Sequence, residues 1–142
     1  MRTKVLLVDD SRTALLMGEM MFREHTGYEV VTARDGQEGV RKALAEKPDL
    51  ILLDVVMPKM DGFAACQEMR THESLRSVPI VMVTSRGEPT NVETGYHSGC
   101  NAYVTKPINA HELLEVVRMF IGPGNEPLPA GSSDRTGREK KR

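Results

Sequence analysis

Short apolar runs alternate along this chain with longer stretches of helical period, and this alternation limits the fold more than any other feature. The apolar runs lie at residues 5–8, 30–32, 50–53, 80–83 and, more weakly, 102–104. Several are apolar at consecutive positions, as strands covered on both faces must be. Helices are expected at residues 11–25, 36–47, 61–71, 90–98 and 109–121. Successive strand–helix units with right-handed crossovers predict an α/β fold with a doubly wound, five-stranded parallel sheet.

The expected helices differ in the strength of their sequence signals. Asp35 and Asn109 can each cap the helix that follows. Apolar stripes run along the second and the last helix, at Val40, Ala43 and Leu44 and at Leu113, Val116, Val117 and Phe120. The fourth stretch is the weakest, because Gly87, Pro89 and Gly95 lie in or beside it and an interior glycine costs roughly 1 kcal/mol. We expect that helix to be short and mobile.

The composition changes abruptly after Ile121, to a segment rich in glycine, proline and serine that ends in a charged run at residues 138–142. Such a segment cannot bury enough apolar area to offset the entropy lost on ordering. Residues 122–142 are therefore expected to be a disordered tail or linker. Residues 1–121 are expected to form one domain, since a chain of 142 residues is about one domain long.

The charge and cysteine content exclude several classes of protein. A formal net charge of −1 gives no electrostatic reason for broad binding to nucleic acid or anionic membranes. No apolar stretch approaches the roughly 18 residues of a membrane helix, so no membrane insertion is expected. The two cysteines, Cys66 and Cys100, are far apart and are interpreted as buried small apolar residues. These features predict a soluble, cytoplasmic protein.

Polar residues that could bind a ligand or take part in a reaction follow the ends of the apolar runs. Asp9 and Asp10 follow the first run, Asp54 the third, Thr84 and Ser85 the fourth, and Lys106 the fifth. Each has an ordinary structural explanation alone, since the aspartates or the threonine could cap helices and the lysine could be solvated. In a doubly wound sheet, however, ligands bind outside the carboxyl ends of the strands. The coincidence of these residues at that edge favours a functional site.

The residue types at this edge indicate a metal ion and a phosphoryl group. Clustered carboxylates repel one another, so such a site favours a cation. Oxygen-only ligands suit Mg²⁺, which commonly works beside a phosphate. The four histidines are scattered and supply no zinc set. The equatorial oxygens of a phosphoryl group need neutralisation, which a metal ion, Lys106 and the Thr84 hydroxyl could provide together.

Four motifs stand in order between residues 3 and 121: Val8-Asp9-Asp10-Ser11, Leu53-Asp54 with Met57-Pro58-Lys59-Met60-Asp61-Gly62, Val83-Thr84-Ser85, and Tyr103 with Lys106-Pro107. In these motifs the chain resembles the receiver domains of bacterial two-component response regulators, including the chemotaxis regulator. The resemblance implies a flavodoxin-like receiver fold with strand order 2-1-3-4-5. It also implies a phosphoprotein of phosphorelay signal transduction, which catalyses only its own phosphorylation and dephosphorylation and is otherwise no enzyme.

The resemblance assigns the acidic residues to metal binding and phosphorylation. Asp54 would be the phosphoacceptor and would receive the phosphoryl group from a phosphohistidine. Asp9, Asp10 and Asp54 would hold Mg²⁺, together with the backbone carbonyl of Val56. Asp61 would cap the third helix.

The remaining motif residues would contact the phosphoryl group or transmit its presence. Lys106 and Thr84 would touch the phosphoryl oxygens, and Thr84 and Tyr103 would form the conformational switch. The Lys106–Pro107 peptide bond would be cis and would aim the lysine into the site. The switched surface is expected on helix four, strand five and helix five, with Thr84 and Tyr103 on the side of the sheet that helices four and five cover.

The expected partners are a sensor histidine kinase or phosphotransfer protein and a downstream protein target, with no direct contact to nucleic acid. A monomer or weak dimer is expected, acting as a stand-alone regulator, although membership of a longer chain stays open. Three alternative kinds of protein differ from this sequence pattern. A haloacid-dehalogenase-type phosphatase would carry its nucleophile on the first strand, and a flavodoxin-like cofactor binder would have a phosphate cradle in the first loop. A pseudo-receiver acting as an interaction scaffold without phosphorylation would typically lack an acidic residue or the lysine.

Overall fold

The computed structural model describes residues 3–85, 96–106 and 108–121. Residues 90–95 of the predicted fourth helix lie outside them, as do Gly87 and Pro89 beside it, and residues 96–98 are helical. Pro107, and with it the predicted cis peptide bond, also lies outside the described residues, as does the predicted tail at 122–142. No helix among the described residues is long and apolar enough to cross a membrane.

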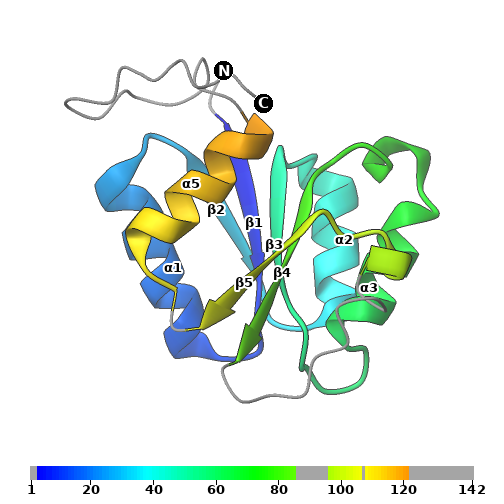
Figure 1. Ribbon diagram of the computed structural model, residues 1–142. Coiled ribbons are helices and arrows are strands. Elements are labelled where there is room, and N and C mark those ends of the chain that lie inside the picture. The colour runs from blue at the N-terminus through cyan, green and yellow to red at the C-terminus, as the bar shows by residue number, and fades with distance from the viewer. Residues whose placement is uncertain (1–2, 86–95, 107, 122–142) are drawn as a thin grey trace.

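All the strands run parallel in one sheet, and they stand in the order β2-β1-β3-β4-β5 (Figure 1). Their bounds are β1 Lys4–Val8, β2 Glu29–Ala33, β3 Leu50–Asp54, β4 Ile80–Ser85 and β5 Ala102–Lys106. This confirms the predicted five-stranded, doubly wound sheet and its strand order. Three strands extend past the apolar runs to Asp54, Ser85 and Lys106, because backbone pairing continues where the side chains become polar.

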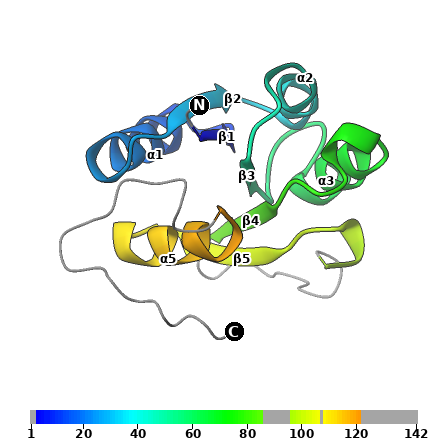
Figure 2. The same ribbon diagram turned by 90° about the horizontal axis from the view of Figure 1, so that it is seen from above.

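Helices cover both faces of the sheet (Figure 2). The described helices are α1 Arg12–His25, α2 Gly36–Glu46, α3 Gly62–Arg70 and α5 Ala110–Ile121, with a short 3₁₀ turn at Glu73–Leu75 that the sequence did not predict. α1 and α5 pack on one face, where Phe22 and Leu113 join the core, and α2 and α3 pack on the other with Ala43 and Met69. The sheet therefore separates two apolar cores, as strands buried on both faces require.

The helix caps follow the chemistry that the sequence predicted, with one correction. Asp35 accepts a hydrogen bond from the Glu38 amide, Asp61 from Ala64 and Asn109 from Glu112, at 2.7 to 2.9 Å.

The α1 cap is Ser11, whose hydroxyl accepts from the Ala14 amide at 3.2 Å. The sequence had left Asp9 and Asp10 as possible caps of this helix. Because Ser11 fills the position, the side chains of both aspartates remain available at the sheet edge.

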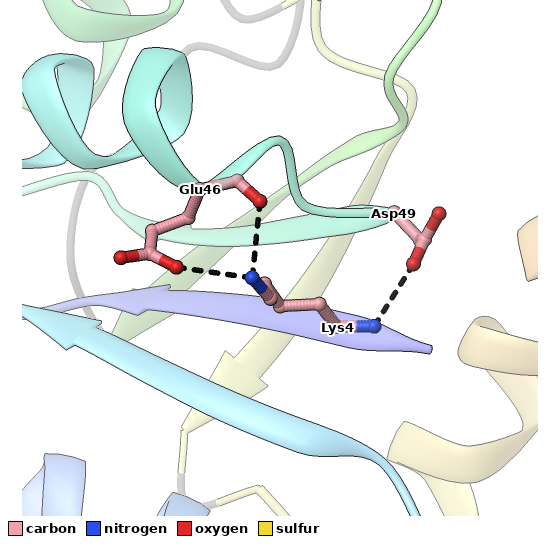
Figure 3. A network of polar contacts seen from close by, with 3 residues as sticks. All are labelled: Lys4, Glu46 and Asp49. Atoms are coloured by element: carbon pink, nitrogen blue, oxygen red, sulfur yellow. Dashed lines mark hydrogen bonds and ion pairs between the residues drawn. The ribbon is translucent and has the colours of Figure 1, made fainter. Parts of the chain in front are cut away.

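Lys4 fastens the amino end of β1 to the connection between α2 and β3 (Figure 3). Its amide donates to Asp49 Oδ2 at 2.9 Å, and its ammonium lies 3.0 Å from Glu46 Oε1 and 3.2 Å from the Glu46 carbonyl oxygen. This network lies at the edge of the sheet opposite the acidic residues. It aligns β1 with β3, and these two strands carry Asp9 and Asp54 at their far ends.

Candidate functional site

Three carboxylates converge at the carboxyl ends of the central strands. Asp9 and Asp10 follow β1, and Asp54 ends the adjacent strand β3. One carboxylate oxygen from each lies within 4.8 Å of the others. Asp9 and Asp54 are only 8% and 4% exposed, whereas Asp10 is exposed. The structure thus brings together the three acidic residues that the sequence placed at one edge.

Lys106 reaches this cluster from the end of β5. Its ammonium lies 2.8 Å from Asp9 Oδ2 and 3.6 Å from Asp54 Oδ1. Burial alone would lower the pKa of Lys106, but the hydrogen bond to Asp9 and the charge of Asp54 outweigh it, so the pKa lies above its ordinary value. The lysine is therefore held as a cation inside the acidic site.

The backbone around β1 fixes the Asp9 carboxylate. The Asp9 amide donates to the Ala33 carbonyl at 3.1 Å, which continues the β1–β2 pairing by one residue. Asp9 Oδ1 accepts from the Ser11 amide at 2.9 Å, while Oδ2 contacts Lys106. Each oxygen of this carboxylate has its own partner, which orients the group without occupying all of its acceptor capacity.

The connection after β3 folds tightly against the strand it leaves. The Val55 amide donates to the Val83 carbonyl, and the Gly62 amide donates to the Val55 carbonyl. A Cβ on Gly62 would lie 2.3 Å from the Asp54 carbonyl oxygen, so only glycine fits here. Val56, whose carbonyl the resemblance assigned to the metal, belongs to this connection, and the residue is 54% exposed.

Thr84 and Tyr103 lie on neighbouring strands and share one face of the sheet. Thr84 pairs with Thr105, and Tyr103 pairs with Met82, so the threonine lies two residues nearer the carboxyl edge. Thr84 is buried, and Tyr103 packs beside Met82 in the core on the α2 and α3 side. Burial raises the pKa of Tyr103 to about 12.

This arrangement corrects the expectation that helices four and five cover the same side of the sheet as Thr84 and Tyr103. α5 packs on the opposite face, against Val104 and Leu52. Side chains alternate between faces along a strand, so Tyr103 and Val104 must point in opposite directions. Among the described helical residues it is Tyr96 that meets Tyr103, a contact that no sequence signal indicated.

The residue set fits a divalent, oxygen-preferring cation. Three carboxylates against one ammonium leave the cluster net negative, and a divalent ion would neutralise it. The described residues of the cluster offer oxygen ligands only, which suits Mg²⁺ rather than zinc or copper. The lysine beside the cluster gives a bound anion a second positive contact.

A doubly wound sheet of this strand order, with an acidic cluster and a lysine at its carboxyl edge, defines a flavodoxin-like α/β domain. Residues 5–118 match the model of the response regulator receiver domain, and the chain belongs to this family of two-component signalling.

Similar proteins include both whole regulators and isolated receivers. The chain is 39% identical over 121 residues to the alkaline phosphatase synthesis transcriptional regulatory protein PhoP of Bacillus subtilis, covering 85% of this chain but 49% of that protein. It is 34% identical over 118 residues to protein PilH of Pseudomonas aeruginosa, covering 83% of this chain and 97% of PilH. The chain thus spans about half the length of one relative and nearly all of the other.

Among solved structures, one similar protein is the receiver domain of the sensor histidine kinase PA1611 from Pseudomonas aeruginosa, solved with a magnesium ion coordinated in the active-site cleft. It is 33% identical to this chain with a TM-score of 0.79, and the match covers 87% of this chain and all of that one. The likeness supports the fold described above.

Proposed function

We propose that Asp54 accepts a phosphoryl group from the phosphohistidine of a sensor histidine kinase or phosphotransfer protein, in a reaction that requires Mg²⁺. The observation that carries the proposal is the placement of the buried Asp54 carboxylate between two further carboxylates and the Lys106 ammonium. A carboxylate in such a setting is a nucleophile beside the cations that a transferring phosphoryl group needs.

In the proposed step, a carboxylate oxygen of Asp54 attacks the phosphorus atom, a P–O bond forms, and the P–N bond to the donor imidazole breaks. The imidazole leaves with the electron pair and takes up a proton. Asp9, Asp10, Asp54 and the backbone carbonyl of Val56 would hold Mg²⁺, which when bound supplies charge neutralisation for the phosphoryl oxygens. Beyond its own phosphorylation by the donor and its own dephosphorylation, the domain would catalyse no reaction.

Lys106 and Thr84 would stabilise the phosphoryl group from the protein side. The Lys106 ammonium already lies 3.6 Å from an Asp54 oxygen, so a phosphoryl group built on that oxygen would lie within its reach. At such a distance, opposite charges interact by about 4 kcal/mol at an effective dielectric of 20. The Thr84 hydroxyl, on β4 beside β3, would donate to a second phosphoryl oxygen.

The proposed output is a changed surface that a downstream protein recognises. When Thr84 moves toward the phosphoryl group, space opens on its face of the sheet, and Tyr103 can turn into it. Burying a large part of an aromatic ring contributes on the order of 1.5–3 kcal/mol, against a two-state gap of a few kcal/mol. Because α5 packs on the opposite face, the surface that this movement would change comprises β5 and helix four, of which residues 96–98 are described. Its partner would be a protein rather than nucleic acid.

Beryllofluoride, an analogue of the bound phosphoryl group, tests the proposal. Amide NMR spectra of the protein with beryllofluoride and Mg²⁺ should show saturable shifts at Asp54, Thr84 and Lys106 that differ from the shifts that Mg²⁺ alone produces, and beryllofluoride without Mg²⁺ should not produce them. An Asp54→Asn variant should show none of these shifts. Spectra of the wild type that stay unchanged with both components present would instead favour the pseudo-receiver, a scaffold that works without phosphorylation.

A further inference from the structure

Tyr103 has two neighbours, Tyr96 and Cys100, that the proposed phosphorylation does not use. The rings of Tyr96 and Tyr103 meet nearly edge to face, with centroids 5.6 Å apart and an interplanar angle of 74°. The Tyr103 hydroxyl and the buried thiol of Cys100 lie within hydrogen-bonding reach of each other. Tyr96 itself is 50% exposed.

These contacts lie on the side of Tyr103 away from Thr84, the residue toward which its ring would move. Cys100 precedes the amino end of β5, whereas Thr84 lies toward the carboxyl end of the neighbouring strand, opposite Thr105. A hydroxyl bonded to Cys100 therefore points along the strand in the direction opposite to Thr84. To turn toward Thr84, the ring of Tyr103 must give up the hydrogen bond and move relative to Tyr96.

We propose that Tyr96 and Cys100 hold Tyr103 in a resting position and thereby set how readily the domain responds to a phosphoryl group. The inference rests on the proposed function, in which Tyr103 follows Thr84. Neither residue would touch the phosphoryl group or the metal, so both act as positioning residues. Their contacts exist only in the resting arrangement, and a ligand of the switched arrangement must overcome them.

The size of the effect follows from the contacts that are lost. An edge-to-face aromatic pair favours the conformation that contains it by a factor of about two to ten in the conformational equilibrium constant. This factor is additional to the effect of the apolar area that the pair buries. A hydrogen bond between a hydroxyl and a thiol contributes a factor at the lower end of the same range, since sulfur is a weak donor and acceptor. The apparent affinity for a ligand of the switched state equals the intrinsic affinity multiplied by the fraction of molecules already in that state. Removing either contact should therefore tighten beryllofluoride binding by about two- to tenfold.

Fluorine NMR on protein labelled with 3-fluorotyrosine tests this directly. The chain has three tyrosines, so each contributes one signal. Tyr28 packs against Phe22 in the core on the α1 and α5 face, and it serves as an internal reference for folding. The Tyr103 signal reports the resting and switched positions, and titration with beryllofluoride in Mg²⁺ gives the affinity.

The variants are Tyr96→Ala, Tyr96→Phe and Cys100→Ala. Tyr96→Ala and Cys100→Ala should bind beryllofluoride about two- to tenfold more tightly, and the Tyr103 signal of each free variant should move toward its bound position. Tyr96→Phe keeps the ring and should behave like the wild type. Should a displaced Tyr28 signal show that the alanine variant is unfolded, Tyr96→Leu, which keeps an apolar side chain without an aromatic edge, gives the same comparison.

Equal affinities in all variants, with the Tyr103 signal of each free protein unmoved, would overturn the restraint while leaving the phosphorylation proposal intact. A wild type that binds no beryllofluoride, with a Tyr103 signal that never moves, would overturn both proposals. The two failures are therefore distinguishable in one set of spectra. A merely structural role for Tyr96 would lower stability in the Tyr96→Ala variant without changing the affinity or the Tyr103 signal.

Discussion

The ammonium of Lys106 lies 2.8 Å from Asp9 Oδ2, although two strands separate β5 from β1 in the sheet. The distance to Asp54 Oδ1 is longer, at 3.6 Å. The closest partner of the lysine is thus a proposed metal ligand rather than the proposed phosphoacceptor. Lys106 and a divalent cation therefore compete for the same carboxylate, because both positive charges are drawn to Asp9 and repel each other.

Replacing Lys106 with methionine should tighten Mg²⁺ binding by about tenfold, or roughly 1.4 kcal/mol. The substitution removes a positive charge from the site and frees Asp9 Oδ2, while keeping an unbranched side chain. Calorimetric titration with Mg²⁺ measures the change. Lys42→Met is the matched control, since Lys42 pairs with Glu38 on α2. Unchanged or weaker Mg²⁺ affinity in Lys106→Met would show that the two cations do not compete.

Replacing Asp10 with asparagine should have opposite effects with and without metal. Without Mg²⁺ the variant loses a like-charge repulsion, so its unfolding free energy should equal or exceed that of the wild type by up to about 1 kcal/mol. With Mg²⁺ it should lose most of the metal-induced stabilisation, since a charged oxygen ligand is missing. Thermal unfolding across a Mg²⁺ series measures both effects, with the exposed Glu73→Gln as control. A variant that gains as much from Mg²⁺ as the wild type would remove Asp10 from the metal site.

Gly62→Ala should be far more damaging than Gly18→Ala. The new Cβ at Gly62 would meet backbone atoms of Asp54 and Val55, which cannot move aside, at 2.3 and 2.9 Å. At Gly18 it would meet only the flexible end of the Leu7 side chain. We expect Gly62→Ala to lose about 2–3 kcal/mol of unfolding free energy and to weaken Mg²⁺ binding through the displaced Asp54. Gly18→Ala should stay within about 1 kcal/mol of the wild type in urea unfolding. Equal losses in the two variants would contradict the close packing at Gly62.

The thiol of Cys100 should make stability depend on alkaline pH. Burial, reinforced by the nearby Cys66, raises the pKa of Cys100 to about 11. An unfolded thiol titrates near 8.5, so the folded-state pKa is the higher of the two. The contribution of the neutral thiol is fully present below about pH 8.5 and is lost as the pH rises toward 11. The stability difference between the wild type and Cys100→Ala should shrink over this range in urea unfolding. Parallel pH profiles for the two proteins would contradict the raised pKa.

The sequence predicted the sheet and the members of the site because both depend on local signals. A buried strand is recognisable from consecutive apolar residues, and the residue at its carboxyl end then has a known position in a doubly wound fold. Asp54 and Lys106 could be placed at one edge for this reason. Helix caps such as Asp35 and Asn109 were equally predictable from the sequence, since a short polar side chain directly before a helix commonly caps it.

Features that depend on contacts between distant segments could not be predicted. Arg70 donates to carbonyls of Gly99, Leu75 and Val78 and so joins α3 to the segments before β4 and β5, yet nothing in the sequence distinguishes it from a surface arginine. The contact of Tyr96 with Tyr103 is of the same kind. The expectation that helix five covers the same side of the sheet as Tyr103 was wrong, because the apolar pattern of β5 does not show which helix packs on which of its two faces.

Phosphorylation at Asp54 is the central claim, and intact mass measurement tests it most directly. The wild type, Asp54→Asn and Asp49→Asn are each incubated with acetyl phosphate and Mg²⁺, and Asp49 serves as control because it lies at the opposite edge of the sheet beside Lys4. We predict that the wild type and Asp49→Asn each gain the mass of one phosphoryl group and that Asp54→Asn gains none. An Asp54→Asn protein that gains the same mass as the wild type would contradict the account.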